Sequence, residues 1–157
     1  MLLALPAVWV VLGSVGGAGF SSAGPCYFAQ VGGAADRFAP LLARLEQIHS
    51  SWPLVSQSAQ HGLWELYRSK AIAFGSGISA MPSVHVATAF VAVLFARHYG
   101  WAFFSLVFLF FLAIGIGSVA LGWHYAVDAY AGATLACPLW LTCGALARRI
   151  AIPELRS

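Results

Sequence analysis

The sequence predicts an all-α integral membrane protein, a bundle of about four transmembrane helices with an amphipathic helix in an outer loop. Of its 157 residues, 61% are hydrophobic and only 8% are charged, whereas soluble domains carry about 25% charged residues. The mean hydropathy is +0.82. These values exclude a soluble domain and a disordered chain. The eight Lys and Arg residues are too few for a nucleic-acid-binding surface.

Four apolar stretches account for the membrane helices: residues 2–20, 84–96, 101–121 and 125–147. The third is uncharged and long enough to cross a bilayer core of about 30 Å as a helix. We expect the first to be a retained helix, with a cleaved signal peptide as the alternative. Its abrupt start also fits a six-helix core that lacks its first two helices.

The positions of the arginines predict the orientation of the bundle. Arg97 lies in the turn between the second and third stretches, and Arg148, Arg149 and Arg156 follow the fourth. Cytoplasmic loops are enriched in Lys and Arg, so these ends are expected to be cytoplasmic. Residues 21–81 then form an outer loop, and the turn at residues 122–124 also faces outward. The chain, residues 1–157, is interpreted as one multi-pass membrane domain.

The outer loop contains two segments with helical character. In the first, apolar residues recur at helical spacing after Asp36, a plausible N-cap: Phe38, Leu41, Leu42, Leu45 and Ile48. This pattern predicts an amphipathic helix, either lying at the membrane interface or packed on the end of the bundle. The second segment, residues 63–74, carries Arg68 and Lys70. These cations are candidates for binding a phosphate, or for anchoring the loop at the lipid headgroups.

Ionisable residues at the ends of membrane helices are costly and therefore informative. The first is His85, in the segment Pro-Ser-Val-His at residues 82–85. Pro82 suits the first position of a helix, and the N–H groups that follow it would form an anion site at the positive end of the helix dipole. Ser83 adds a hydroxyl group, although it is equally well explained as a helix cap. A phosphate ester fits such a site.

The other two ionisable residues are His124 and Asp128, which are four residues apart. On a helix this spacing places the carboxylate beside the imidazole ring. Asp128 is then expected to accept a hydrogen bond from one ring nitrogen, which leaves the other as a nucleophile or base. The topology puts His85 and His124 at the same outer end. Gly115, Gly117 and Gly122 are expected to let the returning segment bend toward His85.

These residues resemble a known family. Residues 82–85 resemble the Pro-Ser-x-His motif of the type 2 phosphatidic acid phosphatase superfamily. Residues 117–128, with a His followed four residues later by an Asp, resemble its last motif. The shorter segments 24–28 and 77–80 resemble the branch that includes the inositol phosphorylceramide synthases. The resemblance covers residues 24–143 and is carried mainly by the two motifs together.

The resemblance implies a reaction without a metal or other cofactor. His124 would attack phosphorus and form a phosphohistidine, Asp128 would orient and charge it, and His85 would protonate the leaving alcohol. A membrane lipid phosphate or phosphodiester would be the donor, and water or a lipid alcohol the acceptor. Phosphatase members carry an Arg where this chain has Gly117 or Ser118, which favours the transferase-like branch.

Two other classes of function remain open from the sequence. The two histidines are also candidates for the axial ligands of a haem in an electron carrier, and the bundle is also compatible with a non-catalytic scaffold that binds lipid phosphate. Neither class requires a Pro-Ser pair before one histidine and an Asp four residues after the other. The sequence therefore favours a lipid phosphatase or phosphotransferase whose site lies at the outer face.

Overall fold

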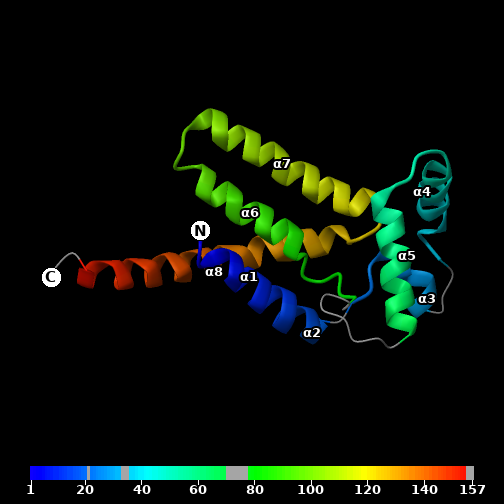
Figure 1. Cartoon of the computed structure of the whole chain (residues 1–157), viewed down its shortest axis with the longest axis horizontal. Helices are drawn as coiled ribbons and strands as arrows, with labels where there is room; N and C mark the ends of the chain where they lie inside the picture. Colours follow the sequence, from blue (N-terminus) through cyan, green and yellow to red (C-terminus); the bar gives the residue numbers. More distant parts are fainter. Residues whose placement is uncertain (21, 33–35, 70–77, 155–157) are drawn as a thin grey trace.

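The computed structural model describes residues 1–20, 22–32, 36–69 and 78–154, and all regular elements there are helices (Figure 1). In chain order they are α1 (Ala4–Val8), η1 (Trp9–Gly16), α2 (Gly17–Phe20), η2 (Pro25–Tyr27), α3 (Phe28–Gly32), α4 (Ala39–Ser51), α5 (Val55–Arg68), α6 (Val84–Ala96), α7 (Trp101–Ala120) and α8 (Ala126–Glu154). Because α1, η1 and α2 follow one another without a break, we call them the N-terminal helical segment. Its middle part, η1, is a π-helix.

The long helices lie alongside one another, with α3, α4 and α5 gathered at one end (Figure 1). The start of the chain, the end of α8 and the α6–α7 connection lie at the other end. By length and composition, three segments in the described residues can cross a membrane: Ala4–Gly32, Trp101–Ala120 and Ala126–Ile150. Helix α6 is a shorter apolar helix, about 20 Å long. These four segments confirm the fold class expected from the sequence.

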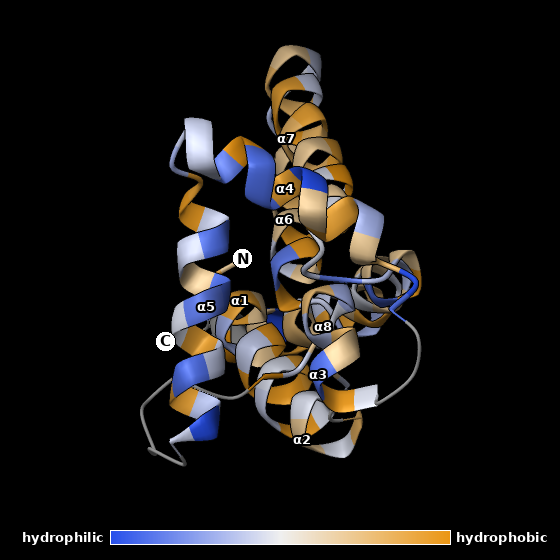
Figure 2. Ribbon diagram, turned by 90° about the vertical axis from the view of Figure 1, so that its right-hand side faces the viewer, coloured by the Kyte–Doolittle hydropathy of each residue, from blue (hydrophilic) through white to orange (hydrophobic). Residues whose placement is uncertain are grey.

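Helix α6 is the centre of the bundle and packs against α7, α8 and the N-terminal helical segment. Its buried positions are mostly alanine and valine, including Ala87 and Val91, which join Val8 and Ala136 in the core. Small residues let membrane helices approach closely. Helix α7 buries none of its side chains within the described structure. Its apolar surface (Figure 2) suits contact with lipid chains.

The outer helices pack on the end of the bundle, at slightly different positions from those expected. The side chain of Asp36 accepts a hydrogen bond from the Phe38 N–H at 2.8 Å, but α4 begins only at Ala39. The second helix begins earlier than expected, at Val55, and residues 70–74 of the predicted segment lie outside the described residues. Gln60 of α5 donates a hydrogen bond to the Leu121 carbonyl at 2.9 Å, which ties α5 to the end of α7.

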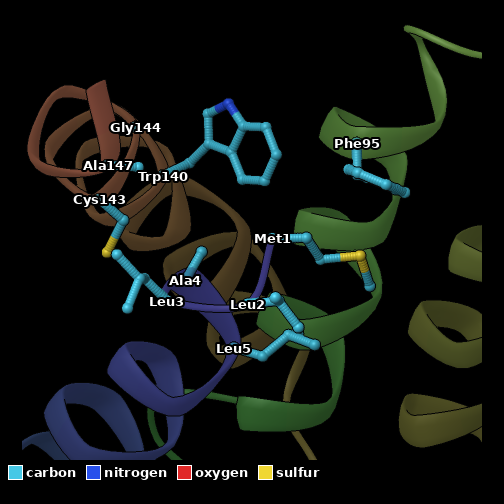
Figure 3. A pocket seen from close by; sticks show the side chains of 10 residues that line it. All are labelled: Met1, Leu2, Leu3, Ala4, Leu5, Phe95, Trp140, Cys143, Gly144 and Ala147. Carbon is cyan, nitrogen blue, oxygen red and sulfur yellow. The ribbon is translucent and has the colours of Figure 1, made fainter. Parts of the chain in front are cut away.

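A cavity of about 630 Å³ lies at the opposite end, where the start of the chain meets α6 and α8 (Figure 3). Its walls are apolar and include Leu2, Leu5, Phe95 and Trp140. No His, Asp, Glu, Lys or Arg is among the described residues that line it. Among its described lining residues the cavity therefore has none of the charged side chains or histidines that a phosphate site would use, although it is the largest of those described here.

Candidate active site

The turn after α7 positions His124. Gly122 adopts φ +74°, a left-handed conformation that glycine adopts at low cost. The Gly122 N–H donates to the Val119 carbonyl at 3.0 Å, and the Trp123 N–H donates to the Ser118 carbonyl at 3.0 Å. These two bonds form a Schellman motif, which ends the helix and reverses the chain. Of the three glycines expected to bend this region, Gly122 makes the turn, whereas Gly115 and Gly117 lie within α7.

Asp128 closes the start of α8. Its carboxylate accepts a hydrogen bond from the Tyr125 N–H at 2.8 Å, which is half of a capping box. The carboxylate also lies near the positive end of the helix dipole, where a negative charge is favourable. Helix α8 begins at Ala126, so His124 precedes the helix. The expectation that His124 and Asp128 share one helical face is therefore wrong.

The segment before α6 is held by hydrogen bonds to distant parts of the chain. The Ala80 N–H donates to the Ser22 carbonyl at 2.6 Å, and the Ser83 N–H donates to the Asp128 carbonyl at 3.1 Å. Helix α8 approaches Ser83 so closely that a Cβ on Gly132 would overlap the Ser83 carbonyl oxygen. The two sequence motifs are thus joined directly, backbone to backbone.

Ser83 is the N-cap of α6. Its hydroxyl oxygen accepts a hydrogen bond from the Val86 N–H at 3.4 Å, and the residue is fully buried. Pro82 precedes this cap, so the expectation that it occupies the first helical position is wrong. The capping interpretation of Ser83 agrees with this geometry.

The imidazole ring of His124 is fixed by a backbone carbonyl. Its Nδ1 lies 2.7 Å from the Ala80 carbonyl oxygen. Because a carbonyl can only accept, Nδ1 carries the proton and Nε2 keeps its lone pair. Nδ1 lies 3.9 Å from the nearest carboxylate oxygen of Asp128, beyond hydrogen-bond range. The expected hydrogen bond from His124 to Asp128 is therefore replaced by the one to Ala80, and Asp128 acts on the ring through its charge.

Burial lowers the pKa of His124, whereas the hydrogen bond to Ala80 and the charge of Asp128 act in the opposite direction. Burial dominates, because taking an imidazolium out of water is costly. The ring is therefore neutral at pH 7, as a nitrogen nucleophile must be.

His85 lies across from His124, near the start of α6. The ring centroids are 6.3 Å apart, with 54° between the ring planes. Because both rings line the same two cavities, a phosphate bound there is a candidate partner for both. His85 is exposed, and Trp9 of η1 meets it edge-on at 6.5 Å between centroids. The sequence analysis did not identify Trp9 or Ala80 as part of the site.

Two cavities meet at the histidine pair, and His85, His124, Leu63 and Trp123 line both of them. The η1-side cavity has a volume of about 440 Å³ and extends toward Trp9 and Ser14 of η1 and the loop before α6. The α7-side cavity has a volume of about 530 Å³ and lies between α5 and Ala113, Ile114 and Gly117 of α7. The two rings are thus accessible from two directions.

The expected phosphate-binding cations are not seen beside the rings. Arg68 lies at the end of α5 and pairs with Glu65 at 3.5 Å, and both side chains are exposed. Lys70 lies outside the described residues. No Lys or Arg is among the described residues that line either cavity. Within the described part of the chain, no three His, Cys, Asp or Glu side chains come together as a metal site would require.

A comparison of the sequence with protein families agrees with this geometry. A family model described as the PAP2 superfamily matches residues 2–142, most of the chain. The chain belongs to the PAP2 superfamily. Comparisons with characterised proteins and with solved structures gave no significant match. Membership supports a phosphatase-type enzyme that acts on a lipid phosphate, and the long apolar helices fit a membrane protein.

Proposed function

We propose that this PAP2 superfamily protein transfers a phosphoryl group, or a phosphate with its headgroup, from a membrane lipid through a phosphohistidine at His124. The observation that carries the proposal is the approach of His85 and His124 to 6.3 Å between ring centroids, from helix ends far apart in sequence. The His124 ring is neutral and held in place by the Ala80 carbonyl, and the His85 ring is exposed to a cavity. That pairing provides a nucleophile and a general acid.

The first step begins with attack of His124 Nε2 on phosphorus. A nitrogen–phosphorus bond forms, and the bond from phosphorus to the leaving alcohol oxygen breaks. His85 gives its proton to that oxygen. The Ala80 carbonyl holds the Nδ1 proton in place, and the negative charge of Asp128 stabilises the cationic ring of the phosphohistidine.

The second step reverses these roles. Neutral His85 accepts a proton from an incoming water or alcohol, whose oxygen attacks phosphorus. The new phosphorus–oxygen bond forms as the nitrogen–phosphorus bond breaks, and neutral His124 is regenerated. No step needs a metal ion.

Substrate phosphate would be held chiefly by backbone N–H groups in the first turn of α6, where the helix dipole is positive, other than those of Ser83 and Val86, which already have partners. Ser83 supports this helix start as its cap. Arg68 and Lys70 remain candidates for attracting anionic headgroups to the outer loop. The distribution of arginines favours a site on the outer face, and the short motifs at residues 24–28 and 77–80 favour the inositol phosphorylceramide synthase-like branch.

The test is to incubate the full chain in membranes with labelled lipid phosphates and phosphodiesters, and to analyse both products and protein. We expect an acid-labile phosphohistidine on the wild type, turnover that is unaffected by EDTA, and neither product nor phosphohistidine with His124→Ala. Wild-type turnover in His124→Ala membranes would exclude His124 as the nucleophile.

A further inference from the structure

The two cavities that share His85 and His124 differ in chemistry. The described residues that line the α7-side cavity are apolar, apart from the two histidines, Ser56 and Ser118. The hydroxyl of Ser118 already donates to the Gly115 carbonyl at 2.9 Å. No charged side chain lines this cavity in the described structure. Such walls stabilise an apolar chain and give nothing to a phosphate.

The η1-side cavity is better supplied with polar groups. Hydroxyl-bearing residues, Ser14, Tyr27 and Ser79, line it together with the loop before α6. The Ser79 hydroxyl donates to the Met81 carbonyl at 3.1 Å, and its oxygen can still accept a hydrogen bond. Of the two cavities, this one suits the phosphorylated lipid.

The α7-side cavity also extends along α7, a helix long and apolar enough to cross a membrane. Ala113, Ile114 and Gly117 lie on one side of α7, and Ala113 is about 10 Å below the outer end of the helix at a rise of 1.5 Å per residue. A molecule in this cavity would have its apolar part at the depth of the lipid chains and its polar end at the histidines.

We infer that the α7-side cavity binds a neutral lipid alcohol that serves as the phosphoryl acceptor, while the phosphorylated donor occupies the η1-side cavity. The inference rests on the proposed function and deepens it. The hydroxyl of the acceptor gives its proton to neutral His85 and its oxygen attacks phosphorus. The nitrogen–phosphorus bond to His124 breaks, and a phosphorylated lipid leaves. Because the acceptor has its own cavity, it can bind while the phosphohistidine persists, and it keeps water away from phosphorus.

Two glycines on α7 provide a matched pair of variants. A Cβ on Gly117 would meet nothing within 4 Å, so Gly117→Phe fills the α7-side cavity without a backbone clash. A Cβ on Gly115 also meets nothing within 4 Å, but Gly115 lines a different cavity, between α7 and α8, with Val86 and Tyr130. Gly115→Phe therefore adds the same side chain away from the histidine pair.

The experiment uses the full chain in vesicles that contain a labelled lipid phosphodiester and a neutral lipid alcohol, either ceramide or diacylglycerol. The ratio of transfer product to hydrolysis product is measured for each variant. We expect Gly117→Phe to lower this ratio about tenfold, which corresponds to about 1.4 kcal/mol of lost acceptor binding, and Gly115→Phe to match the wild type. Ala113→Phe is a second variant of the same cavity.

A second experiment uses the unmodified chain, so its result does not depend on whether the variants fold. A neutral lipid alcohol with a photoreactive acyl chain should crosslink to the segment of α7 that contains Ala113 and Gly117. Crosslinking only to η1 would overturn the inference, as would equal ratios for Gly117→Phe and Gly115→Phe, or an equal loss of transfer and hydrolysis. Hydrolysis without transfer in the wild type would overturn the acceptor site alone. Absence of both turnover and phosphohistidine would overturn the proposed function itself.

Discussion

The two histidines of the site occupy opposite environments. His124 is 7% exposed, follows a Schellman motif and is held by the Ala80 carbonyl. His85 is exposed and lies at the start of α6, with Trp9 at its edge. Under the proposed reaction, the nucleophile is thus preorganised by backbone bonds. The acid–base group keeps access to both cavities, as it must if it serves a leaving alcohol and then an acceptor.

The largest expected effect comes from removing the imidazole ring of His124. His124→Ala should abolish turnover, because among the described residues that line the two cavities the only other histidine is His85, the proposed acid. The measurement is product formation from a labelled lipid phosphodiester in membranes. His61→Ala on α5 is a suitable control, since His61 lies beside Glu46 in the outer helices and should retain full activity.

Replacing His85, the exposed histidine, should separate the formation of the phosphohistidine from its breakdown. In His85→Ala, turnover is expected to fall by about 10²–10⁴-fold, the usual contribution of a general acid–base group. In this variant, a substrate whose leaving group needs no protonation should restore formation of the phosphohistidine but not its breakdown. The phosphoenzyme should therefore accumulate. Loss of the phosphoenzyme with such a substrate would show that His85 does more than transfer protons.

The charge beside the fixed ring should matter less than the ring itself. Asp128→Asn preserves an oxygen that can accept from the Tyr125 N–H but removes the negative charge 3.9 Å from His124. Turnover is expected to fall about 10²-fold, since two charges this close interact with a few kcal/mol at an effective dielectric constant of about 20. The helix start should remain folded. Wild-type turnover would show that the carboxylate acts only as a cap.

The contact that joins the two motifs can be tested through stability. Gly132→Ala places a Cβ against the Ser83 carbonyl oxygen and should cost about 1–3 kcal/mol, seen as a lower Tm in detergent and lower activity. Gly144→Ala, on the same helix, meets only the end of the Arg148 side chain at 3.8 Å. This control should match or exceed the wild-type Tm.

The smallest effect concerns pH. Because burial lowers the pKa of His124, the neutral nucleophile persists as the pH falls below the ordinary histidine value of about 6.5. The acidic limb of kcat/KM that belongs to His124 should therefore lie below that value, when measured with a phosphodiester that does not titrate near neutrality. In Asp128→Asn the acidic limb should move to a still lower pH, because the Asp128 carboxylate raises the pKa of His124. A limb above the ordinary value would contradict the burial argument.

Local signals in the sequence were sufficient for much of this description. Composition predicted the membrane bundle, apolar runs located the long helices, and two short motifs indicated His85, His124 and Asp128 as candidates, which the structure brings close together. A helix cap was one of the two roles that the sequence left open for Ser83, and the structure shows this cap. Predictions were wrong where helix boundaries decide geometry: α8 begins after His124, and Pro82 lies before the cap of α6. A shift of two residues changes which side chains share a helical face.

By itself, the sequence determined that the chain is an all-α membrane protein and which side chains are candidates for chemistry, because both depend on residue type and spacing. Only the tertiary structure decided what holds those side chains. The Ala80 carbonyl, rather than Asp128, fixes the His124 ring, and Gly132 lets α8 reach Ser83. A backbone carbonyl is present at every position and has no signature in the sequence, so its partner emerges only when distant segments pack together.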